Sequence, residues 1–124
     1  MPTTSLRVAI VEDDDLVAMA LTAMLKEAGA TVVATAGTYE AALTLIDGGP
    51  SFDMAFIDLH LGGQASGIDV AHRAVRAGLS VVVMTGSASL PDGLTGAGLL
   101  LKPFSSVQVE TVIHALKTRD TTPA

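Results

Sequence analysis

The stretch FDMAFID (Phe52–Asp58) determines how the rest of this sequence is interpreted. Its apolar run is typical of a parallel strand that is buried on both faces, and it ends on a carboxylate. Ligands of open α/β sheets bind at the carboxyl ends of such strands, so we expect Asp58 at the mouth of a crevice. The alternative is that Asp58 merely begins a turn, which is a common use of aspartate.

Three further strand-like runs also end on polar side chains. RVAIV is followed by Glu12 and Asp13, VVVM by Thr85, and LLL by Lys102. Because the carboxyl ends of parallel strands meet at one edge of a sheet, the four runs would bring acids, a hydroxyl and an ammonium to the same place. This convergence favours a functional role for Asp58 over a simple turn.

Strand-like and helix-like segments alternate along the chain. Five strands are expected, at 6–11, 31–36, 52–58, 81–84 and 99–101. Helices are expected after caps at Asp14 or Asp15 and at Thr38, from about Ile68, and after the capping box of Ser105 and Gln108. Glycines at 29, 48 and 78 would end the first three helices. Such alternation predicts an α/β fold, with a parallel sheet, right-handed crossovers and helices on both faces.

The segment from Ser87 to Gly98 does not fit this alternation. It contains Pro91 and three glycines, at 93, 96 and 98, and it lacks a sustained helical stripe of apolar residues. At most a turn or two of helix is expected there, and the glycines would make the segment easy to deform.

The composition restricts the class of protein. The 124 residues suit one domain spanning 1–124, with a core at about 6–118 and disordered ends at 1–5 and 120–124. A net charge of −6 and few aromatic residues argue against direct nucleic-acid binding. The lack of cysteine excludes a disulfide scaffold and a thiolate metal site. No signal-peptide profile or apolar run of membrane-spanning length is visible, so we expect a soluble, cytoplasmic protein without membrane contact.

The polar residues at the strand ends suggest a specific chemistry. Glu12, Asp13 and Asp58 would repel one another unless a cation compensates them, and carboxylates with water suit Mg²⁺. Lys102 adds a second positive charge, and the Thr85 hydroxyl could bond a phosphoryl oxygen. An ionised aspartate needs no general base to act as a nucleophile, so this set fits phosphoryl transfer to Asp58.

From Leu6 to about Leu116, the sequence resembles the receiver domain of bacterial two-component response regulators. The resemblance is carried by Glu12-Asp13 after a strand, Ile-Asp58-Leu, Met-Thr85-Gly86 and Lys102-Pro103-Phe104. It implies a flavodoxin-like (βα)5 fold with strand order 2-1-3-4-5 and a cis Lys102–Pro103 bond. A histidine kinase or histidine phosphotransfer protein would then phosphorylate Asp58, and an unknown downstream protein would receive the signal.

The same resemblance implies a role for each matched residue. Asp58 would be the phosphoacceptor, Thr85 the switch hydroxyl and Lys102 the phosphoryl-binding lysine. Glu12, Asp13 and Asp58 would hold Mg²⁺, together with the backbone carbonyl of His60. The domain would be a signalling switch or phosphorelay intermediate and not an enzyme.

Three departures from the common receiver pattern affect how the signal could be read. Leu99 stands where the family usually has an aromatic switch residue, so the usual coupling of hydroxyl and aromatic cannot apply. The interval from Thr85 to Lys102 is short, which predicts a short or missing fourth helix. After Asp58 the usual Met-Pro is replaced by His60-Leu61-Gly62-Gly63. The short fourth segment after Thr85-Gly86 resembles the receivers called FAT GUY, which are single-domain regulators with a missing or mobile fourth helix.

The sequence alone leaves open structural, non-functional interpretations of these residues and two rival functions. Glu12 could be a solvated surface acid, Thr85 a β-branched strand end and Lys102 an ordinary surface lysine, while His72 and His114 receive no role. A pseudo-receiver that is never phosphorylated is the second hypothesis, favoured slightly by Leu99. A phosphohydrolase of the haloacid-dehalogenase type ranks last, because such enzymes need an acid where this chain has His60.

Overall fold

Strands and helices alternate in the computed structural model, which describes residues 6–61, 66–87 and 90–120, the last four by backbone alone. The strands in this part of the chain are β1 (Arg7–Val11), β2 (Thr31–Ala36), β3 (Met54–Asp58), β4 (Ser80–Thr85) and β5 (Gly98–Leu101). The helices are α1 (Asp15–Glu27), α2 (Tyr39–Gly48), α3 (Ser66–Arg76) and α4 (Ser106–Asp120). None of these helices combines the length and the apolar character needed to cross a bilayer.

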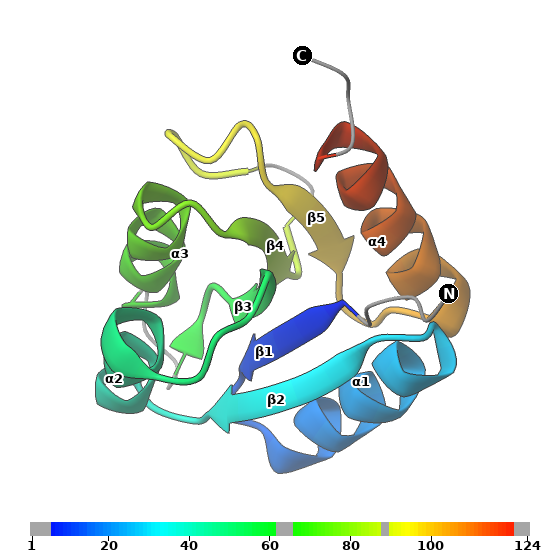
Figure 1. The fold of residues 1–124 in the computed structure, drawn as a ribbon, viewed down its shortest axis with the longest axis horizontal. Coiled ribbons are helices and arrows are strands. Elements are labelled where there is room, and N and C mark those ends of the chain that lie inside the picture. The colour runs from blue at the N-terminus through cyan, green and yellow to red at the C-terminus, as the bar shows by residue number, and fades with distance from the viewer. Residues whose placement is uncertain (1–5, 62–65, 88–89, 121–124) are drawn as a thin grey trace.

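The strands form one parallel sheet in the order β2-β1-β3-β4-β5. Helices α1 and α4 cover one face of the sheet, and α2 and α3 cover the other (Figure 1). This arrangement confirms the predicted flavodoxin-like fold and strand order. It follows from right-handed crossovers, which place a helix on one face or the other according to the direction in which the chain moves along the sheet.

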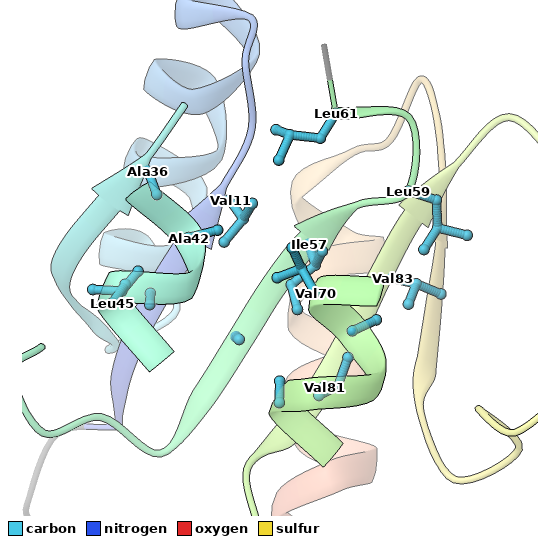
Figure 2. Packing of buried hydrophobic residues seen from close by; sticks show 14 of the residues in the cluster. Val11, Ala36, Ala42, Leu45, Ile57, Leu59, Leu61, Val70, Val81 and Val83 are labelled. Carbon is cyan, nitrogen blue, oxygen red and sulfur yellow. The ribbon is translucent and has the colours of Figure 1, made fainter. Parts of the chain in front are cut away.

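Strand β3 is the central strand of the sheet, between the two pairs of helices, and all of its residues are buried. Met54 and Phe56 pack into the cluster beneath α1 and α4. Ile57 belongs to the cluster beneath α2 and α3, where Figure 2 shows it near Val70 and Val83. Because alternate side chains of a strand point to opposite faces, one apolar run supplies both cores and carries Asp58 to the sheet edge.

Most helix boundaries agree with the predicted capping signals. Asp14 caps α1, with its Oδ1 accepting from the backbone N–H of Leu16 at 2.9 Å. Thr38 caps α2 through its hydroxyl oxygen. Ser105 and Gln108 form the expected reciprocal capping box before α4.

The predicted boundaries differ from the structure at two places. Helix α3 begins at Ser66, so Gly67 lies inside the helix and not in the loop predicted for 61–67; residues 62–65 lie outside the described part of the chain. Helix α4 extends to Asp120, the first residue of the C-terminal stretch expected to be disordered. The rest of that stretch, 121–124, and the N-terminal residues 1–5 also lie outside the description.

The connection between β4 and β5 contains no helix among its described residues, 86–87 and 90–97. Turns take the place of a helix: the N–H of Leu94 donates to the carbonyl of Pro91 at 3.2 Å, and that of Ala97 to the carbonyl of Leu94 at 3.0 Å. Leu94 is only 1% exposed and joins the cluster beneath α2 and α3. The prediction of a short or missing fourth helix is therefore confirmed for the described residues, and Leu94 covers part of the sheet in its place.

Gly67 allows α3 to begin directly against the end of β3. A Cβ added there would lie 2.0 Å from the carbonyl oxygen of Asp58 and 2.7 Å from the carbonyl carbon of Leu59. These are backbone atoms, which cannot move aside as a flexible side chain could. The absence of a side chain at residue 67 thus fixes how closely the helix approaches Asp58.

Gly67→Ala is expected to lower the free energy of unfolding by about 2–3 kcal/mol, because the new methyl group overlaps the backbone of β3. Urea unfolding measures the loss, and amide shifts of Leu59 and His60 show whether the end of the strand moves. Gly48→Ala is the matched control, since it lies in α2 with open space around it. The control should gain up to ~1 kcal/mol from helix propensity. Equal effects of the two changes would contradict the close approach.

Candidate functional site

The carboxyl ends of β1, β3, β4 and β5 bring the predicted polar residues to one edge of the sheet. Carboxylate oxygens of Glu12, Asp13 and Asp58 lie within 4.8 Å of one another. The ammonium nitrogen of Lys102 lies 2.8 Å from Oε1 of Glu12 and 3.4 Å from Oδ2 of Asp58. Four of the residues singled out from the sequence therefore meet, from positions as far apart as 12 and 102.

Thr85 reaches the same edge as the last residue of β4. Its neighbour Met84 pairs with Asp58 across the sheet, and its own carbonyl accepts the backbone N–H of Lys102 at 2.9 Å. The Thr85 hydroxyl oxygen accepts the N–H of Ser87 at 3.1 Å. Thr85 is thus linked on one side to Lys102 and on the other to the start of the β4–β5 connection.

The acids differ in burial, so the site has a closed side and an open side. Glu12 and Asp58 are only 4% and 5% exposed, whereas Asp13 is exposed. The Lys102 side chain is 28% exposed. A small solute could therefore approach from the side of Asp13 while the buried carboxylates remain fixed by their surroundings.

Each buried carboxylate contacts one backbone N–H and one ammonium. For Asp58, Oδ1 accepts the N–H of His60 at 3.0 Å, and Oδ2 faces Lys102. For Glu12, Oε2 accepts the N–H of Asp14 at 3.2 Å, and Oε1 faces Lys102. These bonds hold the two side chains in position without the help of any group from outside the chain.

The pKa of Glu12 is raised above its ordinary value of 4.5. Burial is the main cause and the charge of Asp58 adds to it, while hydrogen bonds from Lys102 and Asp14 act in the opposite direction. For Lys102, burial lowers the pKa, but the Glu12 hydrogen bond and the charges of Asp58 and Glu12 outweigh it, so the pKa rises above 10.5. The ammonium is therefore firmly protonated, whereas the Glu12 charge is held at a cost.

The acid cluster is suited to a small divalent cation. With metal–oxygen distances of about 2.1 Å, opposite ligands of Mg²⁺ lie about 4.2 Å apart. The three carboxylates are spread only slightly more widely, at up to 4.8 Å. A small inward movement would bring the three oxygens within reach of one ion, and waters would fill the remaining positions of an octahedral shell. A cation there would also offset the burial and the Asp58 charge that make ionisation of Glu12 unfavourable.

Residues near the site follow the sequence predictions in two further respects. The Lys102–Pro103 peptide bond is cis, as the resemblance implied. Leu99 is half-buried and packs on the cluster beneath α2 and α3, so an aliphatic side chain fills the position of the usual aromatic. His60 is exposed, and the metal role of its carbonyl stays a prediction.

Two contributors to the site were missed from the sequence. Gly67 carried a signal, because a glycine near the start of a predicted helix indicates a close backbone approach. The backbone N–H of Asp14, which donates to Glu12, carried none, because only the folded chain shows which amide faces a carboxylate.

Glu12→Gln is expected to raise the free energy of unfolding at neutral pH in the absence of divalent cations. Because the folded-state pKa of Glu12 is raised, the stability that its protonated form contributes is complete below 4.5 and is lost as pH rises through the folded value. The variant and the wild type should therefore be equally stable in acid and diverge towards pH 7. Unfolding curves between about pH 3 and about pH 8 measure the difference.

The control for this change is Glu110→Gln, which neutralises an exposed glutamate of α4. Adding Mg²⁺ should stabilise the wild type more than Glu12→Gln, since a ligand stabilises the form that binds it better. A variant that is less stable than the wild type at every pH would contradict the cost assigned to the Glu12 charge.

Comparisons with known proteins agree with this geometry. The comparison with curated proteins found no match to the chain. Among solved structures, SdrG from Sphingomonas melonis Fr1 is 29% identical, with a TM-score of 0.78 and coverage of 94% of this chain and 99% of that one. The receiver domain of PhyR from Erythrobacter litoralis is 24% identical, with a TM-score of 0.77 and coverage of 97% and 95%.

A longer relative, the response regulator PhyR from Brucella abortus, is 25% identical with a TM-score of 0.76. The match covers 95% of this chain and 53% of that one, so the chain spans about half of its length. The family model of the response regulator receiver domain matches residues 8–114, which include every residue of the site. The chain therefore belongs to the response regulator receiver domain family.

Proposed function

We propose that this domain accepts a phosphoryl group on Asp58 in a Mg²⁺-dependent reaction and acts as a phosphorylation-controlled switch or phosphorelay intermediate. The observation that carries the proposal is the Lys102 ammonium, which lies between Glu12 and Asp58 beside three clustered carboxylates. Such an arrangement neutralises charge around an acid that can still be esterified. The donor would be a histidine kinase or a histidine phosphotransfer protein.

In this proposal Asp58 is the nucleophile. An oxygen of its ionised carboxylate forms a bond to phosphorus as the bond between phosphorus and the donor's histidine nitrogen breaks. Glu12, Asp13 and the carbonyl of His60 would hold Mg²⁺ together with Asp58. When bound, the metal supplies positive charge to the phosphoryl oxygens. Lys102 supplies the second positive charge, because its ammonium nitrogen lies 3.4 Å from Oδ2 of Asp58.

Thr85 would report the modification to the rest of the chain. Its hydroxyl now accepts a hydrogen bond from Ser87, and it also has a hydrogen to donate to a phosphoryl oxygen. Phosphorylation adds charge and strong acceptors that attract such donors. A turn of the Thr85 hydroxyl towards Asp58 would change its bond to Ser87 and disturb the β4–β5 connection. This proposed readout does not need an aromatic residue at position 99.

Incubation with acetyl phosphate and Mg²⁺ is expected to add one phosphoryl group to each chain. The backbone amides of His60, Ser87 and Lys102 should shift, because each donates to Asp58 or Thr85. Intact-mass spectrometry and amide NMR spectra measure the two effects. Removal of the divalent cation with a chelator should abolish both.

Asp58→Asn should abolish the mass gain, whereas Asp53→Asn, at an exposed acid just before the same strand, should leave it unchanged. A folded wild-type protein that gains no phosphoryl group under these conditions would falsify the proposal. That result would favour the rival function as an unphosphorylated interaction module. Continuous turnover of a phosphomonoester would instead favour a phosphohydrolase.

The proposed donor has a suitable surface beside the site. A groove of about 430 Å³ runs between α1 and the start of the β5–α4 connection, and its lining includes Leu16, Met24 and Phe104. Leu16 is 76% exposed, and nearby on α1 Met19 is 67% exposed. Lys102 also lines this groove, so a protein bound there would lie next to Asp58. Exposed apolar side chains next to a reactive acid support docking of a protein donor.

Leu16→Glu is expected to slow phosphoryl transfer from a phosphorylated histidine phosphotransfer protein by roughly tenfold, because a charge replaces an apolar contact at the interface. The reaction with acetyl phosphate should not change, since this small donor needs no docking surface. Val75→Glu on α3 is the control, at an apolar residue that is 41% exposed on the other side of the sheet. Equal slowing with both donors would place the defect in the site itself and contradict the docking role.

A further inference from the structure

The β4–β5 connection is fastened to α3 at two adjacent residues. Leu94 is buried in the cluster beneath α2 and α3. Gly93 lies directly against the imidazole of His72, because an added Cβ would sit 2.7 Å from its Cε1 and 3.4 Å from its Nδ1. One residue is inserted into the core, and its neighbour abuts a half-buried ring of the helix.

The backbone at this point is adapted to the contact. Gly93 has a φ of +84°, a left-handed conformation that glycine adopts without strain. Gly93 lies inside the turn in which the N–H of Leu94 donates to the carbonyl of Pro91, and the carbonyl of Leu94 accepts the N–H of Ala97. These two hydrogen bonds stabilise the turns in the described part of the connection. The amides of Leu94 and Ala97 therefore report whether the connection is packed against α3.

The other end of the connection is bonded to the proposed site. Thr85 is 2% exposed, and its hydroxyl oxygen accepts the N–H of Ser87, three residues before Leu90. A hydroxyl drawn towards a phosphoryl group on Asp58 alters this bond. Ser87 and Gly93 lie in the same short connection, so the fastened residues follow the proposed site closely in the sequence.

Free space lies beside the fastened residues. A cavity of about 360 Å³ is enclosed by the end of α3, the start of β4 and the connection, with Val75, Leu79, Leu94 and Ala97 among its lining residues. The His72 ring blocks movement of Gly93 towards α3, since that side is already in contact. A displacement of the connection away from α3 would take Leu94 out of the core.

We propose that Leu94 and His72 form a latch that holds the β4–β5 connection against α3, and that phosphorylation of Asp58 opens it. Opening uncovers apolar residues of α3 and β4 that Leu94 now covers. The trigger rests on the proposed function, while the latch itself rests on the contacts of Gly93 and Leu94. His72, to which the sequence assigned no role, becomes a positioning residue for the connection.

The trigger is tested with beryllofluoride and Mg²⁺ on the full chain, by hydrogen exchange of the Leu94 and Ala97 amides. Their exchange is expected to become roughly tenfold faster, because opening breaks the hydrogen bonds that they donate. Shifts of the His60 and Lys102 amides report independently that the site is occupied. If the His60 and Lys102 amides shift but the exchange rates of the Leu94 and Ala97 amides do not change, the latch alone is overturned. Absence of any shift at His60 and Lys102 would overturn the proposed function and the trigger together.

The contact between Gly93 and His72 is tested with a double-mutant cycle. Gly93→Ala should open the latch without beryllofluoride, because its methyl group collides with the imidazole. Gly29→Ala gives the effect of left-handed strain alone, since Gly29 has a φ of +90° and no atom within 4 Å of an added Cβ. His72→Ala combined with Gly93→Ala removes the collision, so the double variant should exchange more slowly at Leu94 than Gly93→Ala does.

Additive effects of the His72 and Gly93 changes would overturn the latch. If Gly93→Ala does not fold, Leu94→Ala provides the second test, because it shortens the inserted side chain and leaves the backbone conformation unchanged. The Ala97 amide of Leu94→Ala should exchange rapidly before beryllofluoride is added and gain little afterwards. A normal, further increase on adding beryllofluoride would show that Leu94 does not hold the connection.

Discussion

The ammonium of Lys102 compensates two carboxylates that the fold removes from water. Glu12 and Asp58 are both nearly buried, and the nitrogen lies 2.8 Å from one and 3.4 Å from the other. Burying like charges together is costly unless a cation stands between them. The shared ammonium leaves the compensation incomplete, as the raised pKa of Glu12 indicates. A divalent cation at the acids would complete it and would leave Lys102 to compensate Asp58. The same shortage of positive charge accounts for the proposed metal dependence and the proposed phosphoryl binding.

This electrostatic arrangement depends on the sheet, because the residues come from four different strand ends. The parallel order places β3 between β1 and β4, so Asp58 lies between the acids that follow β1 and the Thr85 end of β4. Lys102 is fixed through its own backbone, which donates to the Thr85 carbonyl. On the other side, Gly67 lets α3 begin against the carbonyl of Asp58. A displacement of any one strand would therefore separate charges that have to lie within a few ångströms.

The fold could be predicted from the sequence to a large extent, because its signals are local. Five apolar runs, glycine stops and capping residues such as Thr38 each reflect a physical preference of a few neighbouring residues. The identity of the polar residues after each run, combined with parallel topology, was enough to predict that Asp58 and Lys102 meet. The start of α3 was predicted two residues too late, because Gly67 reads as a loop residue when the strand that it touches is unknown. The His72–Gly93 contact could not be predicted at all, since it joins two segments whose relation only the packed structure shows.

No helix lies among the described residues between β4 and β5. This lowers the free energy that a local opening of the connection would need. A helix on this face would bury a stripe of side chains and would have to move as a unit. Among the described residues of the connection, the buried Leu94 and the partly buried Leu90 and Ala97 pack on this face, and two turn hydrogen bonds join Leu94 to Pro91 and Ala97. Segments with few buried contacts open at low free energy, well below global unfolding. A single altered hydrogen bond at Thr85 is a small perturbation, and it can shift an equilibrium only if the opposing contacts are comparably few. The connection has few buried residues among those described, so under the proposed function a receiver with Leu99 in place of an aromatic switch residue would still have a physical route from Asp58 to its surface.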